Sequence, residues 1–333
     1  MNATARIVSR LGMAVMASGT GAFAGDYPVT IDNCGASLRF DAAPERVIGL
    51  GQNSTEILMM LGLQDRIAGS AIWVSPVLDD LAEAEATVPR ISDTTPGFEA
   101  VVARDPDLLA VQFNSSVGPD GRIGTPEQFA DLGIPTYLSP TNCGTDTRGN
   151  GDGSRERLYS NALLYTEVDE LSRIFGVPDR GRSLVAEMSA REEAVRGRAA
   201  DGVSILYWFS SPEVAGDAWV AGKNGAPGYI NSLLGAGNVI DSEEEWPLVG
   251  WETIAALDPT VIVIGTMDRR NQPADDPAVK RDFLATDPLA RELTAVREGR
   301  IVEMDAQAMN PTLRTVQGAE VLARALDDFG LLK

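Results

Sequence analysis

The feature that most constrains the fold of this chain is an internal repeat. Gly97–Pro106 reads GFEAVVARDP and Gly250–Pro259 reads GWETIAALDP, so both copies follow the pattern Gly-aromatic-Glu-x-x-x-Ala-x-Asp-Pro. An apolar run follows each copy, Leu108–Val111 in the first case and Val261–Ile264 in the second. Each copy therefore predicts a short helix, a proline that ends it, and a buried strand.

A second pair of similar segments supports this repeat. Ser54–Gly62 and Gly228–Gly235 are both apolar helical patterns that end in Leu-Gly. A strand-like segment follows each of them, around residues 66–71 and 238–241. Two related halves of alternating strands and helices predict an α/β fold with two similar lobes and mostly parallel central sheets.

One long helix is predicted between the two halves, over Pro178–Ala199, which is rich in alanine, glutamate and arginine. Its apolar side consists of Leu184, Val185, Met188 and Val195. A helix of about 20 residues would be ~30 Å long, and it would limit hinge motion. The predicted division is an N-terminal lobe over 25–177, a connecting helix over 178–200 and a C-terminal lobe over 201–333, with a ligand cleft between the lobes. Two independent domains are the alternative.

The N-terminus has the pattern of an export signal. Arg6 and Arg10 are positive, Leu11–Ala17 is a short apolar run, and Ala22-Phe23-Ala24 has the form of a cleavage site. We therefore predict a signal peptide over residues 1–24, cleaved near Ala24-Gly25, and a periplasmic protein. No cysteine stands at the cleavage site, so we expect no lipid anchor. A disordered N-terminus without a targeting role is the alternative.

Composition excludes several classes of function. A net charge of −20 argues against nucleic-acid binding, and the absence of histidine removes the general base of Ser-His-Asp and Cys-His catalysis. We therefore expect no enzyme and no intrinsic cofactor. The chain has two cysteines, Cys34 and Cys143. In an exported chain this pair predicts one disulfide that closes a loop of about 109 residues, with two separate thiols as the alternative.

Side chains that follow the predicted strands are candidates for the cleft, because ligands in α/β folds lie outside the carboxyl ends of the strands. These candidates are Trp73, Gln112, Asn114, Trp208, Trp219, Arg269 and Arg270. Tryptophan can stack on a macrocycle or a catecholate, and arginine can bind an anionic siderophore. Core packing and surface solvation are the alternatives. A hydrolase that pairs carboxylates such as Asp93 and Asp305 across the cleft is a competing class.

Five short segments then occur in a recognisable order and spacing. They are Pro44–Ile48, Thr55–Leu58, Asp105–Asp107, Gly225–Gly228 and Trp246–Val249. In these segments the chain resembles the periplasmic substrate-binding proteins of ABC importers for ferric siderophores, cobalamin and haem, whose lobes are joined by one long helix. The resemblance extends over about residues 28–333.

The resemblance implies partners and further site residues. An ABC permease dimer with its ATPase subunits is the expected partner, and the chain is expected to be a monomer. In this family an acidic residue of each lobe docks into arginine pockets of the permease, and the matching positions are Glu99 and Glu252. A first-turn glutamate also offsets the helix dipole, so helix capping is a compatible alternative.

Ligand residues follow from the same resemblance. Aromatic residues embrace the ligand in the cobalamin-binding relatives, and Trp73 and Trp246 match those positions. Relatives also place an arginine near Arg314. The expected ligand is a metal chelate rather than a bare metal ion: a ferric siderophore first, cobalamin or a related corrinoid second, and haem third. The chain has no histidine to ligate haem iron; tyrosine could do so, but no particular tyrosine stands out.

Overall fold

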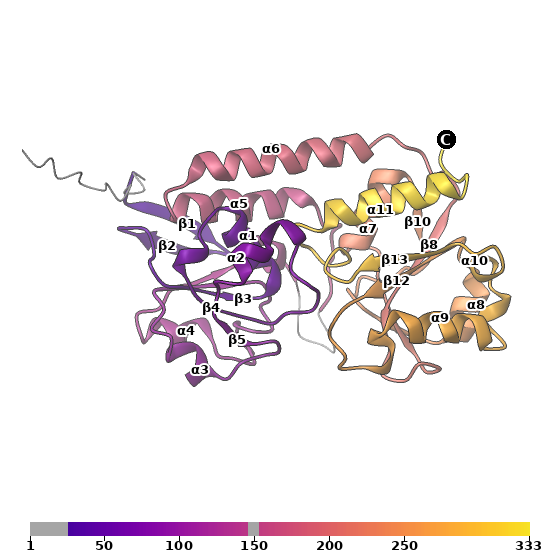
Figure 1. Cartoon of the computed structure of the whole chain (residues 1–333), viewed down its shortest axis with the longest axis horizontal. Helices are drawn as coiled ribbons and strands as arrows, with labels where there is room; N and C mark the ends of the chain where they lie inside the picture. Colours follow the sequence, from indigo (N-terminus) through magenta and orange to yellow (C-terminus); the bar gives the residue numbers. More distant parts are fainter. Residues whose placement is uncertain (1–25, 146–152) are drawn as a thin grey trace, which may run out of the picture.

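The computed structural model describes residues 26–145 and 153–333, so the predicted signal peptide lies outside the described residues. Two α/β lobes lie side by side, and one long helix runs along the first lobe and reaches the second (Figure 1). The predicted fold class is confirmed: each lobe contains a central sheet in which parallel strand pairs predominate. No helix in the described ranges is long and apolar enough to cross a membrane.

The first lobe is built on a five-stranded sheet of order β5-β4-β3-β6-β7, in which all pairs are parallel. Its strands are β3 (Val47–Leu50), β4 (Ile67–Ala71), β5 (Arg90–Ser92), β6 (Leu108–Val111) and β7 (Thr136–Leu138). Its helices are α1 (Gln52–Met60), α2 (Ala82–Glu85), α3 (Phe98–Val102), α4 (Pro126–Ala130) and α5 (Asn161–Ile174). All residues of β3 and β6 are buried, as expected when helices cover both faces of a parallel sheet.

The second lobe contains the order β11-β9-β8-β12-β13, and β10 also pairs with β8. Its strands are β8 (Ser204–Ser210), β9 (Ala218–Val220), β10 (Gly237–Asn238), β11 (Leu248–Val249), β12 (Val261–Thr266) and β13 (Ile301–Asp305). Its helices are α7 (Ala226–Leu234), α8 (Trp251–Leu257), α9 (Pro277–Thr286), α10 (Thr294–Arg297) and α11 (Thr315–Asp328). Strands β8, β10, β12 and β13 pair in parallel, whereas β9 and β11 form an antiparallel edge.

The sequence repeat has the same local structure in both lobes. Helices α3 and α8 each begin after an extended glycine, Gly97 or Gly250, and each leads into the buried strand β6 or β12. The aspartates that precede the prolines, Asp105 and Asp258, both have positive φ values, of 51° and 39°. Aspartate tolerates this conformation better than most residues, so the Asp-Pro pair gives the same turn in both copies.

The connecting helix is α6 (Pro178–Val195), which is shorter than predicted. It ends at Val195 because Arg196 is extended and Gly197 has a φ of +86°. Helix α6 packs against α5 of the first lobe and against α7 and α11 of the second. Its Met188 belongs to the first lobe's core and Val195 to the second lobe's core, so one helix joins both cores.

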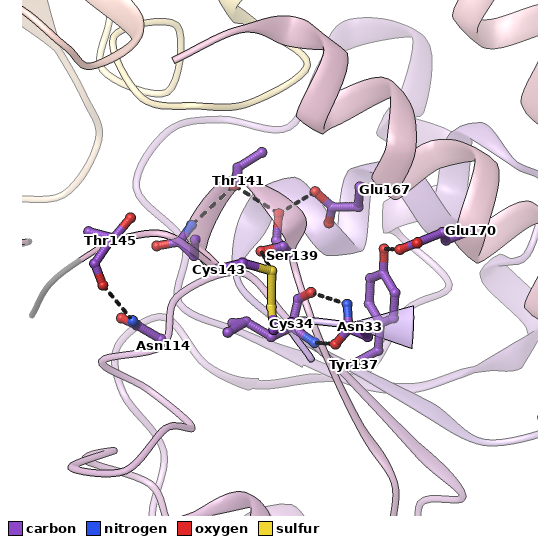
Figure 2. Close-up of a disulfide and its surroundings, with 12 residues drawn as sticks. Asn33, Cys34, Asn114, Tyr137, Ser139, Thr141, Cys143, Thr145, Glu167 and Glu170 are labelled. Atoms are coloured by element: carbon purple, nitrogen blue, oxygen red, sulfur yellow. Dashed lines mark hydrogen bonds between the residues drawn. A yellow bond between two sulfur atoms is a disulfide. The ribbon is translucent and has the colours of Figure 1, made fainter. Parts of the chain in front are cut away.

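A disulfide joins Cys34 to Cys143, with a Cα–Cα distance of 5.1 Å, as the cysteine pair predicts. Cys34 lies in the turn of a hairpin formed by β1 (Val29–Asn33) and β2 (Ala36–Phe40). Cys143 follows β7 and a 3₁₀ turn (Figure 2). Asn33 reinforces the link, because its side chain makes two hydrogen bonds with the backbone of Leu138, of 2.7 and 2.8 Å. The hairpin is thereby attached to the edge of the first sheet.

Candidate ligand-binding cleft

Two adjoining hollows of ≈ 430 and ≈ 210 Å³ lie where the lobes meet. They share six lining residues: Trp73, Val74, Asp93, Thr94, Arg269 and Asn271. Val77, Glu85, Arg90 and Arg270 are among the residues that line only the larger hollow. Phe113, Arg122, Phe209 and Gln307 are among those that line only the smaller one. The combined site has the size of a small-molecule pocket.

Carboxyl ends of strands from both lobes supply most of this lining. Trp73 follows β4, Asp93 follows β5 and Phe113 follows β6. In the second lobe, Phe209 lies at the end of β8 and Arg269 follows β12. Parallel strands place their carboxyl ends at one edge of the sheet, so both edges face the same cleft.

The two lobes touch beside the hollows. The carbonyl oxygen of Val74 accepts hydrogen bonds from the backbone N–H groups of Asp268 and Arg269, of 3.1 and 3.2 Å. The Arg269 guanidinium also lies 3.5 Å from the carboxylate of Asp275, which is fully buried. Burial acts to raise the pKa of Asp275, but hydrogen bonds from Ser210 and two backbone N–H groups outweigh it and lower that pKa. Asp275 therefore supplies a negative charge behind Arg269.

A buried lysine lies next to this carboxylate. The Lys280 ammonium donates hydrogen bonds to the carbonyl oxygens of Phe209 and Gly265, of 2.5 and 2.6 Å. These carbonyls lie near the ends of β8 and β12, so Lys280 fixes the backbone that presents Phe209 to the cleft. Burial lowers the pKa of Lys280 to about 7, although the charge of Asp275 acts in the opposite direction.

A buried ion-pair network joins the lobes at Arg314. Its guanidinium contacts both carboxylate oxygens of Glu56, and another of its nitrogens lies 2.8 Å from the carboxylate of Asp305. Asp305 in turn accepts a hydrogen bond of 2.9 Å from the hydroxyl of Ser75. Burial raises the pKa of Glu56, while Arg314 acts against that rise. Because Glu56 and Ser75 belong to the first lobe, the network fixes one lobe against the other.

Of the candidates chosen from the sequence, Trp73, Arg269 and Arg270 line the hollows. Gln112 is buried, and its side-chain oxygen accepts a hydrogen bond of 3.0 Å from the N–H of Asn53 at the start of α1. Asn114 donates to the carbonyl oxygen of Thr145 and lines neither hollow. Gln112 therefore has a structural role at the helix start, in place of the ligand contact expected of it.

The second-lobe tryptophans do not line the hollows. Trp208 is fully buried against Trp251 and Phe283, with ring centroids 4.8 and 5.7 Å away, so it packs the core and the expectation of a ligand contact is wrong. Trp219 lies in β9, outside both hollows. Trp246 packs on Phe209 at 4.6 Å, and it supports the ring that faces the cleft.

Several lining residues escaped prediction from the sequence. Phe209 follows Trp208 directly, and the alternation of side chains along a strand turns Phe209 toward the cleft while Trp208 points into the core. Phe113 stands two residues beyond the end of β6. Strand alternation predicts that Phe209 and Trp208 point to opposite faces, and the position after a strand end predicts Phe113 at the cleft. Arg90 stands at the beginning of a strand, so no rule based on strand ends could have identified it.

The repeat glutamates Glu99 and Glu252 are both exposed, in the first turns of α3 and α8. These helices lie in different lobes, on the side of the molecule away from α6 (Figure 1). Neither N-cap glycine offers a side-chain cap, and each glutamate carboxylate lies near its own N-cap residue. The two lobes thus present the same acidic helix start.

The carboxylates considered for a hydrolase are bound by different arginines. Asp93 pairs with Arg90 at 2.8 Å, and Asp305 pairs with Arg314. Within the described ranges, the chain has no group of three or more His, Cys, Asp or Glu residues that could hold a metal ion.

Comparisons with known proteins agree with this architecture. Residues 47–308 match the family model described as "Periplasmic binding protein". An uncharacterised ABC transporter substrate-binding lipoprotein of Bacillus subtilis is 22% identical over 90% of this chain and 86% of the relative. A vitamin B12-binding protein of Vibrio campbellii is 28% identical over 66% of this chain and 70% of the relative.

A solved structure extends the comparison. An ABC-type Fe³⁺-hydroxamate transport system protein from Saccharomonospora viridis superposes with a TM-score of 0.70 at 26% identity, covering 91% of this chain and 99% of the other. These relatives are binding proteins rather than enzymes, which confirms the expectation that the chain is not an enzyme. The chain therefore belongs to the periplasmic binding protein family, the substrate-binding proteins of ABC transporters.

Proposed function

We propose that this chain is exported to the periplasm, captures a metal chelate as a monomer and delivers it to an ABC permease dimer. The ferric siderophores are the first class of ligand in this proposal. The observation that carries it is the cleft itself, which gathers four arginines in a chain of net charge −20. The proposal includes a cleaved signal peptide.

The cleft chemistry suits a chelate that carries acceptor oxygens. Its four arginines are Arg90, Arg122, Arg269 and Arg270. A guanidinium has a planar fork of N–H donors that fits carboxylate and catecholate oxygens. Phe113 and Phe209 supply aromatic surface for the organic part of the chelate. A ferric siderophore needs both features, and a bare metal ion needs neither.

A corrinoid is the second candidate, because the 28%-identical Vibrio relative is described as a vitamin B12-binding protein. Haem is third. The chain has no histidine, and no tyrosine lines either hollow in the part of the chain that the structure describes. Haem iron would therefore lack the protein ligands that it usually has.

We further propose that Glu99 and Glu252 dock into the permease, one glutamate for each permease subunit. Two like charges on equivalent helices of similar lobes suit a partner built from two subunits. The lobes are already in contact through Val74 and the Glu56–Arg314 ion pair, so capture requires only modest closure. The ATPase subunits supply the energy for import, and this chain performs no covalent chemistry.

Ligand capture is tested by titrating the mature protein with ferric hydroxamates, ferric catecholates, ferric citrate, cobalamin and haemin. Tryptophan fluorescence and calorimetry both report binding. We expect saturable binding of a ferric siderophore, weakened roughly tenfold or more in Arg269→Ala, because one charged hydrogen bond is lost. Arg291→Ala is the matched control, since Arg291 is exposed and pairs with its exposed neighbour Glu292. Tight binding of cobalamin with no response to any siderophore would favour the second candidate.

Docking is tested with the permease and its ATPase subunits in lipid nanodiscs. We expect Glu99→Gln and Glu252→Gln each to reduce the stimulation of ATP hydrolysis by the loaded protein while leaving chelate affinity unchanged. Glu193→Gln is the control, because Glu193 is an exposed glutamate on α6. If all three variants stimulate ATP hydrolysis equally, Glu99 and Glu252 serve helix capping and not docking.

A further inference from the structure

The indole ring of Trp73 is covered by an arginine. The guanidinium carbon of Arg90 lies 4.1 Å from the ring centroid, and Trp73 is only 5% exposed. Trp73 also packs in the core of the first lobe, and its Nε1–H donates to the hydroxyl of Ser70 at 3.3 Å. With the core on one side and Arg90 on the other, the ring offers a ligand no open face.

The donor edge of Arg90 is occupied as well. One of its terminal nitrogens lies 2.8 Å from the carboxylate of Asp93, and the other binds the carboxylate of Glu85 at the end of α2. When a guanidinium lies over an aromatic ring, its N–H groups stay in the plane of the guanidinium and point outward from its edge. These are the groups that would recognise an anion, and two carboxylates of the protein already hold them. All four residues line the larger hollow.

We propose that Asp93 and Glu85 occupy the anion site of the cleft in the ligand-free protein, and that an anionic oxygen of the ligand replaces Asp93 on Arg90. Trp73 then acts as the platform under the guanidinium rather than as a ligand contact. This inference rests on the proposed capture of a chelate. It identifies Asp93 as a residue that sets specificity for charged ligands.

Exposure explains why Asp93 is the residue exchanged. Its side chain is 72% exposed, whereas that of Glu85 is 26% exposed. Exposed ion pairs are weak because water competes for both partners, so the Arg90–Asp93 pair is easily replaced. An anionic ligand recovers the ion pair that it breaks. A neutral ligand does not, and the site therefore discriminates by charge.

The test measures affinities for two ferric anions, ferric citrate and a ferric tris-catecholate, and for neutral cyanocobalamin, by calorimetry at fixed ionic strength. We expect Asp93→Asn to bind the anions up to about fivefold more tightly, because the competing charge is gone. The substitution keeps the side-chain shape, and the backbone carbonyl of Asp93 still accepts from the N–H of Trp73 at 2.9 Å. We expect Arg90→Gln to lose roughly tenfold or more for the anions. Cyanocobalamin affinity stays unchanged in both variants.

Two further variants separate this exchange from general effects of charge and packing. Asp41→Asn removes an equally exposed aspartate that pairs with Arg39 after the β1–β2 hairpin, and it leaves anion affinity unchanged. Trp73→Phe retains an aromatic platform and keeps anion affinity within a few-fold of the wild type.

Unchanged or weaker anion binding in Asp93→Asn would overturn the exchange. Tighter anion binding in Arg90→Gln would overturn it too, because Arg90 would then only shield the Trp73 ring. If the wild-type protein binds neither the ferric anions nor any other chelate, the proposed function fails and the exchange fails with it. Wild-type binding that is indifferent to both substitutions overturns the exchange alone.

Discussion

Replacing Arg314 by methionine tests the ion-pair network that joins the lobes. Methionine is unbranched and shorter than arginine, so the change keeps an apolar stem and removes the charge and the fork of donors. The Glu56 carboxylate would remain, at 1% exposure, with the Gln52 side-chain amide at 3.0 Å as its remaining side-chain donor. Asp305 would lose its arginine but keep the hydroxyl of Ser75.

The expected cost follows from the burial of Glu56. Removing one partner of a buried ion pair typically costs about 3–5 kcal/mol, because the other charge is left uncompensated. Burial already raises the pKa of Glu56, and Arg314 opposes that rise. Without Arg314 the pKa rises further, so the folded variant takes up a proton at acidic pH. The destabilisation should therefore be smaller at pH 5 than at pH 8.

Equilibrium unfolding in urea, followed by circular dichroism at both pH values, measures this loss. Arg191→Met is the control, because Arg191 makes a similar two-bond contact with Glu320 but is 41% exposed, and its loss should cost less than about 1 kcal/mol. The double variant Glu56→Gln/Arg314→Met should recover about 1–3 kcal/mol of the loss. A cost below 1 kcal/mol for Arg314→Met, or one that is independent of pH, would refute the reasoning.

Three further predictions concern stability. Reduction of the Cys34–Cys143 disulfide should lower the free energy of unfolding by roughly 2–5 kcal/mol. The loss should appear as a lower melting temperature with dithiothreitol than without it. Burial raises the pKa of Glu167 to about 7. The free energy of unfolding of the wild type should therefore fall by roughly 3 kcal/mol as the pH rises from about 4.5 through 7. Urea unfolding of Glu167→Gln should lack this pH dependence. A Cβ at Gly181 would lie 2.3 Å from the Ser172 hydroxyl oxygen, so Gly181→Ala should separate α5 from α6 and lower stability by roughly 1–3 kcal/mol in the same assay.

Each of these three has its own contrary result. A Cys34→Ser/Cys143→Ser variant with wild-type melting behaviour would show that the bridge adds nothing to stability. An unaltered pH profile in Glu167→Gln would assign the dependence to other groups. Gly144→Ala is the control for Gly181→Ala because, among the described residues, a Cβ at Gly144 meets nothing within 4 Å. Equal losses in both variants would remove the steric explanation.

The sequence by itself determined the architecture, and the reason is periodicity. The repeated Gly-aromatic-Glu-x-x-x-Ala-x-Asp-Pro segment sets a helix, a turn and a buried strand through local conformational preferences, and these act in the same way in both copies. Burial of β3 and β6 on both faces follows from their uninterrupted apolar composition. The cysteine count likewise predicted the disulfide, because only one pairing is possible.

Tertiary structure decided which side chains face the cleft. Trp208 and Phe209 are neighbours with similar chemistry, and alternation places them on opposite faces of β8. The packing of the second lobe then decided that Trp208 is buried and that Phe209 lines the ligand space. Arg314 was selected for the cleft, but it is bound by a glutamate 258 positions away in the sequence. Such pairings depend on how two lobes meet, and no local pattern records that contact.

Arg90 illustrates the same limit. Its role arises because β5 lies beside β4 in the folded sheet, which places the guanidinium over Trp73 and between Asp93 and Glu85. Local preferences are short-ranged, so the sequence determined the strands, the helices and their order. Charge pairing and shielding from water act between segments distant along the chain, so only the tertiary structure decided which groups form the cleft and which of its charges a ligand must displace.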